Sequence, residues 1–143
     1  MIGATPVTDL SVRGVLLSLL LGVSASAATW HVDDDGADHD GADFVSIQAA
    51  IDAAGDGDVI VVHPGLYVAD PGASEVVDTL GKKVDIQSSG GHENTIIDGQ
   101  GTVRGLVCTS GETFETIIGG FTIRNGHSQT LDFNGNGDAD HWE

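Results

Sequence analysis

The chain has 143 residues, of which 22 are acidic and 5 basic, and its formal net charge is −17 at pH 7. So few Lys and Arg residues argue against nucleic acids or anionic bilayers as partners, because phosphate binding depends on basic side chains. The acidity favours solubility and divalent cations instead. Cys108 is the only cysteine, which excludes an internal disulfide, and we expect it to be a small buried thiol.

Residues 1–28 have the features of a secretory signal peptide. Arg13 precedes an apolar run at 15–23, and the small residues around Ala25 and Ala27 satisfy the cleavage rule. The run is about half of the roughly 20 apolar residues that a membrane-spanning helix needs; a non-cleaved anchor is the alternative. We therefore expect a secreted or cell-surface protein, free of the membrane after cleavage, with one modest mature domain.

Residues 29–58 are predicted to be an acidic N-terminal segment that leads into a helix. Phe44, Ile47 and Ile51 recur at helical spacing among alanines. Asp43 is placed as the N-cap, and a Gly-Asp-Gly-Asp sequence ends the helix.

Residues 59–126 combine short apolar runs with Gly-rich turns. Val59–Val62 is a β-branched run and predicts a strand buried on both faces, with Gly65 and Tyr67 in the turn that leaves it. Further strand-like segments follow at 84–87, 95–97, 104–108, 117–118 and 121–123.

The spacing of these segments favours a solenoid over a sandwich. Val61 and Ile86 lie 25 residues apart, and Gly99 and Gly126 lie 27 residues apart. A period of this size with about three strands is typical of a coiled solenoid. Asn125 and Gly126 form the only pair typical of a tight hairpin turn.

Six segments together have a familiar pattern: Ser46–Ala54, Gly57–Val62 and Pro64–Tyr67 near the N-terminal end, and Lys83–Ser88, Thr95–Gly99 and Gly120–Gly126 further along the chain. The first three resemble the N-terminal end, and the last three the successive rungs, of right-handed parallel β-helix proteins of the pectin-lyase-like superfamily. The resemblance implies an all-β fold, a right-handed parallel β-helix whose first rung is covered by an N-terminal capping α-helix. Since the stretch allows only about four rungs, we expect an incomplete solenoid that is part of a longer protein.

Residues 127–143 are predicted to contain a calcium loop. With Asp132 as position 1, oxygen-bearing side chains fall at the spacing of an EF-hand loop, with Gly137 at its turn. The stretch also resembles the calcium loop of dockerin modules; the alternative is an acidic turn between rungs. The predicted ligands are Asp132, Asn134, Asn136, Asp138 through its backbone carbonyl, Asp140 and Glu143.

A weaker calcium candidate is the aspartate cluster at 33–43, for which a solvated loop is the favoured interpretation. His39 lies in this cluster and is a candidate transition-metal ligand, although it is a single imidazole among carboxylates.

No complete catalytic apparatus is evident. Lyases of the superfamily use carboxylates that hold calcium and an Arg or Lys base. The resemblance therefore draws attention to the bases Lys82, Lys83, Arg104 and Arg124 and to the acids Asp85, Asp98, Glu112 and Glu115. None of them matches a catalytic motif, and Asp98 is interpreted as a turn residue.

The sequence thus favours a secreted, calcium-stabilised β-helix module that serves as a non-catalytic scaffold or carbohydrate-facing surface, with acidic or other polysaccharides as partners. The alternative is the N-terminal fragment of a pectate-lyase-like polysaccharide lyase or glycoside hydrolase.

Overall fold

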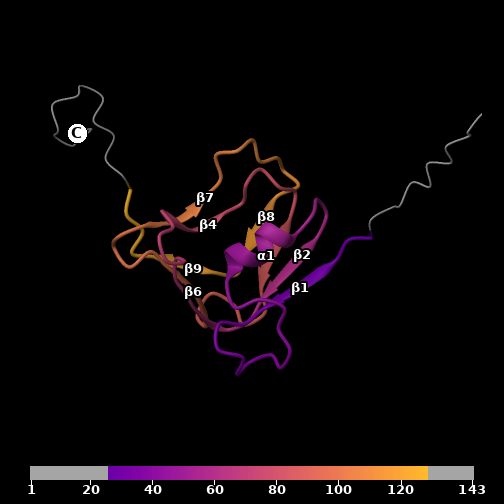
Figure 1. Ribbon diagram of the computed structural model, residues 1–143, viewed down its shortest axis with the longest axis horizontal. Coiled ribbons are helices and arrows are strands. Elements are labelled where there is room, and N and C mark those ends of the chain that lie inside the picture. The colour runs from indigo at the N-terminus through magenta and orange to yellow at the C-terminus, as the bar shows by residue number, and fades with distance from the viewer. Residues whose placement is uncertain (1–25, 129–143) are drawn as a thin grey trace, which may run out of the picture.

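The computed structural model of the chain describes residues 26–128 (Figure 1). In this range one strand precedes a single short helix, and the strands that follow the helix wind into a coil. No helix in this range is long and apolar enough to cross a bilayer. The elements are β1 (Thr29–Val32), α1 (Ile47–Ala53), β2 (Val59–Val62), β3 (Gly65–Tyr67), β4 (Glu75–Asp78), β5 (Asp85–Ser88), β6 (Thr95–Asp98), β7 (Arg104–Val107), β8 (Ile117–Gly119) and β9 (Thr122–Arg124).

The strands form three parallel sheets, which together make a β-solenoid of about three turns. The sheet orders are β1-β2-β5-β8, β3-β6-β9 and β4-β7, so the turn formed by β5, β6 and β7 adds one strand to the edge of each sheet. Val59 pairs with Asp85, and Asp85 pairs with Ile117, always in parallel register. The parallel β-helix predicted from spacing and resemblance is therefore confirmed.

Aliphatic side chains stack inside the coil from one turn to the next. Ile60 of β2 is in register with Ile86 of β5 and Ile118 of β8. Ile60 and Ile86 are almost fully buried, and each such side chain contributes about 1.5–3 kcal/mol. Because neighbouring residues of a strand point to opposite faces, residues next to these core positions point outward.

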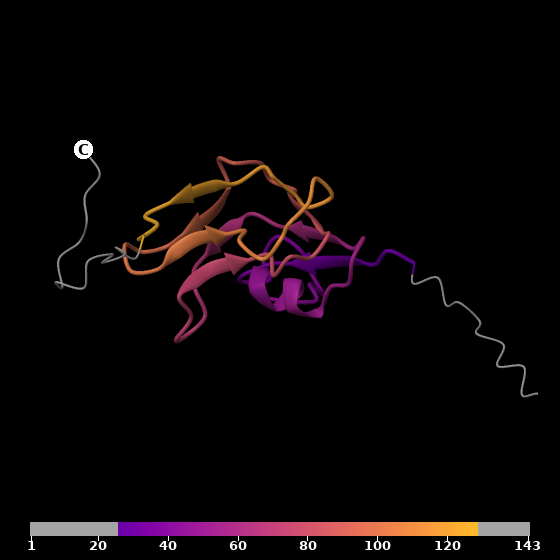
Figure 2. The ribbon, with the colours of Figure 1, turned by 90° about the horizontal axis from the view of Figure 1, so that it is seen from above.

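Helix α1 covers the N-terminal end of this core, as predicted. Ile47, Ala50 and Ile51 are buried, and the helix packs against β1, β2 and β4. Figure 2 shows α1 on one side of the stacked strands and the C-terminal strand on the other. Lys82 Nζ donates to three backbone carbonyls at the end of the helix, at 2.6 to 3.0 Å, where the helix dipole favours a cation.

Side chains also form hydrogen bonds with the free backbone groups at the outer edges of the first strands. The side-chain amide of Gln48 forms the two hydrogen bonds that a neighbouring strand would form with Asp78. It accepts from Asp78 N at 2.7 Å and donates to Asp78 O at 3.2 Å. The Asp34 carboxylate accepts from the N–H of Leu66 in β3, and the Asp43 carboxylate accepts from that of His31 in β1. Such coverage blocks edge-to-edge pairing with another chain.

The boundaries of the capping helix differ from the prediction. Its N-cap is Ser46, whose Oγ accepts from Ala49 N, and not Asp43, whose carboxylate is bonded to β1. Phe44 lies outside the helix and pairs with Val32 in an isolated parallel bridge. The extended backbone at Phe44 thus prolongs the edge of the first sheet.

Three other expectations were wrong. Gly65–Tyr67 is strand β3 and not a turn, because it pairs with β6. Val59–Val62 is buried at alternate residues only, since one face of its sheet lies outside the coil. Cys108 is exposed, because it follows the inward-facing Val107 where β7 ends.

Candidate metal centre

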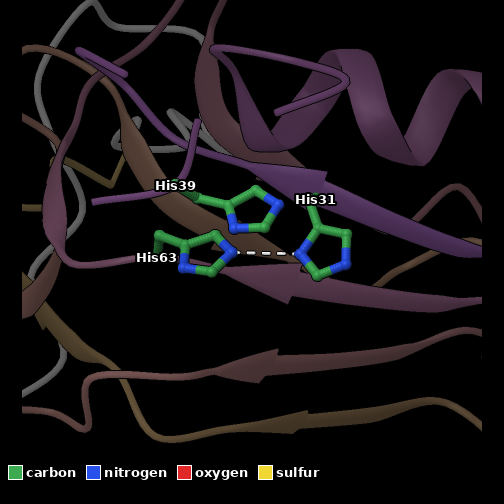
Figure 3. Close-up of side chains that lie close together, drawn as sticks. All are labelled: His31, His39 and His63. Atoms are coloured by element: carbon green, nitrogen blue, oxygen red, sulfur yellow. Dashed lines mark hydrogen bonds between the residues drawn. The ribbon is translucent and has the colours of Figure 1, made fainter. Parts of the chain in front are cut away.

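Three histidines gather where the chain leaves β1 and β2. His31 lies on β1, His63 directly follows β2, and His39 belongs to the acidic loop, residues 33–43, that joins β1 to the capping helix. One ring nitrogen from each histidine lies within 4.8 Å of the others. Figure 3 shows the three rings grouped beside the paired strands.

Strand register brings His31 and His63 together. β1 and β2 pair in parallel with Val32 opposite Val62, and the ladder continues as His63 N donates to Val32 O at 2.8 Å. Since Val32 and Val62 point into the core, the flanking histidines point outward. His31 Nδ1 and His63 Nε2 are 3.0 Å apart.

His39 is placed by the buried carboxylate of Asp33. That carboxylate accepts four backbone N–H groups of the acidic loop, including His39 N at 2.6 Å and Asp38 N at 3.0 Å. Burial would raise the pKa of Asp33, but these hydrogen bonds outweigh it and hold the pKa below its usual value. The ionised Asp33 therefore shapes the loop and carries the His39 ring over the other two.

The rings are stacked. The His39 ring centroid lies 4.3 Å from those of His31 and His63, with interplanar angles of 20° and 5°. Burial lowers the pKa of His63, and the charges of His39 and His31 lower it further. His63 is thus held neutral, the form in which an imidazole can donate a lone pair to a metal.

Three imidazoles form a donor set for zinc, copper or nickel, whereas calcium requires hard oxygen ligands. Tetrahedral zinc with Zn–N bonds of about 2.0–2.1 Å separates ligand nitrogens by about 3.3 Å. The separation of His31 Nδ1 and His63 Nε2 needs to widen by only a few tenths of an ångström. Because an ion lies in the plane of the imidazole that binds it, the His39 ring has to rotate out of the stack.

The aspartate cluster beside this site does not have the character of a calcium site. Carboxylate oxygens of Asp33, Asp35 and Asp38 lie within 4.8 Å of one another. Both oxygens of Asp33 already accept backbone N–H groups, and Asp35 accepts from Ala37 N at 2.8 Å. These bonds shape the loop. Asp35 and Asp38 are exposed, as expected for a solvated acidic loop, whereas Asp33 is buried beneath it.

The predicted calcium ligands cannot be placed in the fold. Asp132, Asn134, Asn136, Asp138, Asp140 and Glu143 lie outside the described residues. Sequence reasoning considered His39 alone and missed His31 and His63. The position of His63 directly after a predicted strand could have drawn attention to it. Its partner His31, however, lies on β1, a strand that was not predicted.

The candidate lyase bases all have structural partners. Lys82 binds the end of α1, and three ion pairs of 2.7 to 2.8 Å engage the others: Lys83 with Glu115, Arg104 with Glu75 and Arg124 with Asp98. The hydrogen bond and charge of Glu115 raise the pKa of Lys83, opposite to what a general base requires. Asp98 accepts from Gln100 N at 2.8 Å, as a turn residue does.

Comparisons with protein-family models, curated proteins and solved structures find no match to this chain. The case for its function therefore depends on the geometry of its own residues.

Proposed function

We propose that this chain is a β-solenoid module that binds a divalent transition-metal ion of the zinc class through His31, His39 and His63. The observation that carries the proposal is the convergence of three ring nitrogens, from two paired strands and one loop, within 4.8 Å. A lone surface histidine has no such partners. Three imidazoles in reach of one point match the three-histidine ligand set found in some catalytic zinc sites.

The electrostatics of the site support the capture of a cation. The chain carries a net charge of −17, and the acidic loop bearing His39 contains six aspartates, residues 33, 34, 35, 38, 40 and 43. A negative field raises the local concentration of divalent ions without supplying ligands itself. The imidazoles then provide selectivity against calcium and magnesium.

Isothermal titration of the purified chain with zinc chloride at pH 7.5 (about one unit above the usual histidine pKa) tests the proposal. We expect one ion per chain, and we expect His39→Ala and His63→Ala each to abolish saturable binding. His92→Ala is the matched control, because His92 is exposed and lies outside the cluster. Absence of heat with the wild-type chain, or unchanged binding by both cluster variants, refutes the proposal.

We further propose that the module is exported and serves as a non-catalytic scaffold or carbohydrate-facing surface, in keeping with its resemblance to the pectin-lyase-like superfamily. The parallel coil and the structural engagement of the basic side chains support this role. If the chain is exported, the protein recovered from the culture medium should begin near residue 28. A glycan array probed with the chain, with and without zinc, tests the carbohydrate role; no binding to any acidic or neutral polysaccharide contradicts it.

Calcium binding by the segment 127–143 remains a separate proposal. The two sites predict different responses: Asp132→Ala should remove calcium binding and spare zinc, whereas His39→Ala should do the reverse. A calcium titration in which Asp132→Ala behaves as the wild type contradicts the calcium loop.

The competing proposal is that the chain is part of a pectate-lyase-like enzyme. It predicts unsaturated uronate products from polygalacturonate in the presence of calcium. The absence of such products favours the scaffold.

A further inference from the structure

A third turn of the solenoid reaches the histidine cluster through Ser89. We propose that Ser89 is a positioning residue of the metal centre, which fixes the ring of His63 by accepting a hydrogen bond from its Nδ1. This inference rests on the proposed zinc site and names a residue that acts through one of its ligands.

Strand pairing places Ser89 beside His63. β2 and β5 are in register with Val62 opposite Ser88, so the residues that directly follow the two strands, His63 and Ser89, are neighbours. Ser89 N donates to Val62 O at 2.9 Å, which fixes the backbone of Ser89. From there Ser89 Oγ lies 3.2 Å from His63 Nδ1.

The two nitrogens of His63 therefore have partners on opposite sides. Nδ1 lies by Ser89 Oγ, while Nε2 lies 3.0 Å from His31 Nδ1, at the centre of the cluster. A neutral imidazole that offers the Nε2 lone pair to an ion carries its proton on Nδ1. Ser89 Oγ can accept that proton's hydrogen bond and can direct its own hydroxyl proton to Val62 O at 3.4 Å.

The remaining freedom of His63 lies in its side chain. Its backbone N–H donates to Val32 O at 2.8 Å, and its carbonyl accepts from the Tyr67 hydroxyl at 2.9 Å. With the backbone held on both sides, rotation of the ring is what Ser89 restricts. Partners that orient a metal-binding histidine in this way typically change metal affinity by about 10- to 100-fold. Because Ser89 is exposed and water can replace it, we expect about tenfold, the lower end of that range.

The test compares the wild type, Ser89→Ala, Ser89→Thr and the control Ser110→Ala, whose exposed side chain is distant in sequence from the cluster. Zinc affinity is measured by competition titration, and the tautomer of His63 in the metal-free chain at pH 8 (where histidine is neutral) by ¹⁵N NMR. We expect Ser89→Ala to weaken zinc binding about tenfold and to lose the Nδ1–H preference of His63. Ser89→Thr, which keeps the hydroxyl, should restore both.

The inference is overturned by wild-type zinc affinity in Ser89→Ala, or by an Nε2–H tautomer of His63 in the wild type. The failure of the zinc site itself is distinguishable, because the wild type then binds no zinc. An affinity loss shared equally by Ser110→Ala shows a general structural effect and also overturns it.

Discussion

Replacing Ile51 by alanine should destabilise the protein strongly, because Ile51 joins helix α1 to the core. Ile51 is fully buried, on a helix that packs against β1, β2 and β4. The substitution removes three carbon groups, and about 0.8 kcal/mol for each gives about 2.4 kcal/mol. The cavity left behind raises the expected loss of unfolding free energy to about 3–4 kcal/mol, a large part of the roughly 5–15 kcal/mol that stabilises a typical domain.

Urea unfolding followed by circular dichroism measures this loss. The control is Val45→Ala, since Val45 directly precedes the N-cap but is 70% exposed, and its unfolding free energy should stay within about 0.5 kcal/mol of the wild type. Ile51→Asp, which places a carboxylate in the core, should expose the first turn and aggregate during size-exclusion chromatography. If Ile51→Ala unfolds at the same urea concentration as Val45→Ala, the capping role assigned to α1 is refuted.

Three further predictions concern the edge, a turn and acid stability. Gln48→Ala should lower the unfolding free energy by about 1–3 kcal/mol, because it leaves the N–H and C=O of Asp78 without their partners; an unchanged urea midpoint contradicts this. Gly99→Ala should lower it by about 1–3 kcal/mol, because a Cβ there would lie 2.5 and 2.7 Å from two backbone carbonyl oxygens. Gly55→Ala, whose nearest neighbour is at 3.9 Å, should melt at nearly the wild-type temperature. Hydrogen bonds from backbone N–H groups lower the pKa of Asp58 from 3.8. The ionised carboxylate therefore stabilises the fold above that pH, and this stabilisation is lost as the pH falls through the folded-state pKa. Thermal melts from pH 5 to 2 should show a weaker acid dependence in Asp58→Asn, and a profile identical to that of the wild type contradicts this role of Asp58.

Elements with a strong local pattern were predictable from the sequence. Val59–Val62 is a β-branched run between turn residues and forms β2, and Ile47 and Ile51 have the helical spacing of α1. The interval between such runs favoured a coiled solenoid, and the resemblance implied its parallel winding. The structure places Ile60 opposite Ile86, and not Val61, from which the interval was measured, so the spacing of these turns is one residue longer. These features depend on side-chain type and spacing, which the sequence displays directly.

Features that depend on pairing were not predictable in the same way. Thr29–Val32 is short and precedes an acidic stretch, so it was included in the acidic N-terminal segment. Glu75–Asp78 has acidic residues at both ends and was not predicted as a strand. The candidate metal centre was missed for the same reason. His31 and His63 become neighbours only through the register of β1 on β2, and His39 joins them only through the hydrogen bonds of Asp33.

At the N-terminal end of the coil, side chains occupy the strand edges where a preceding turn would pair. These side chains are those of Gln48, Asp34 and Asp43, and they prevent further turns from being added at this end. Later turns join their neighbours through backbone ladders, stacked aliphatic side chains and ion pairs such as that of Arg124 with Asp98. A copied turn inserted between β5–β7 and β8–β9 would meet parallel strand edges on both sides. Each such insertion would lengthen the rod by about 4.8 Å. Duplication of turns would therefore change the length of the solenoid and leave the histidine cluster in place at its N-terminal end.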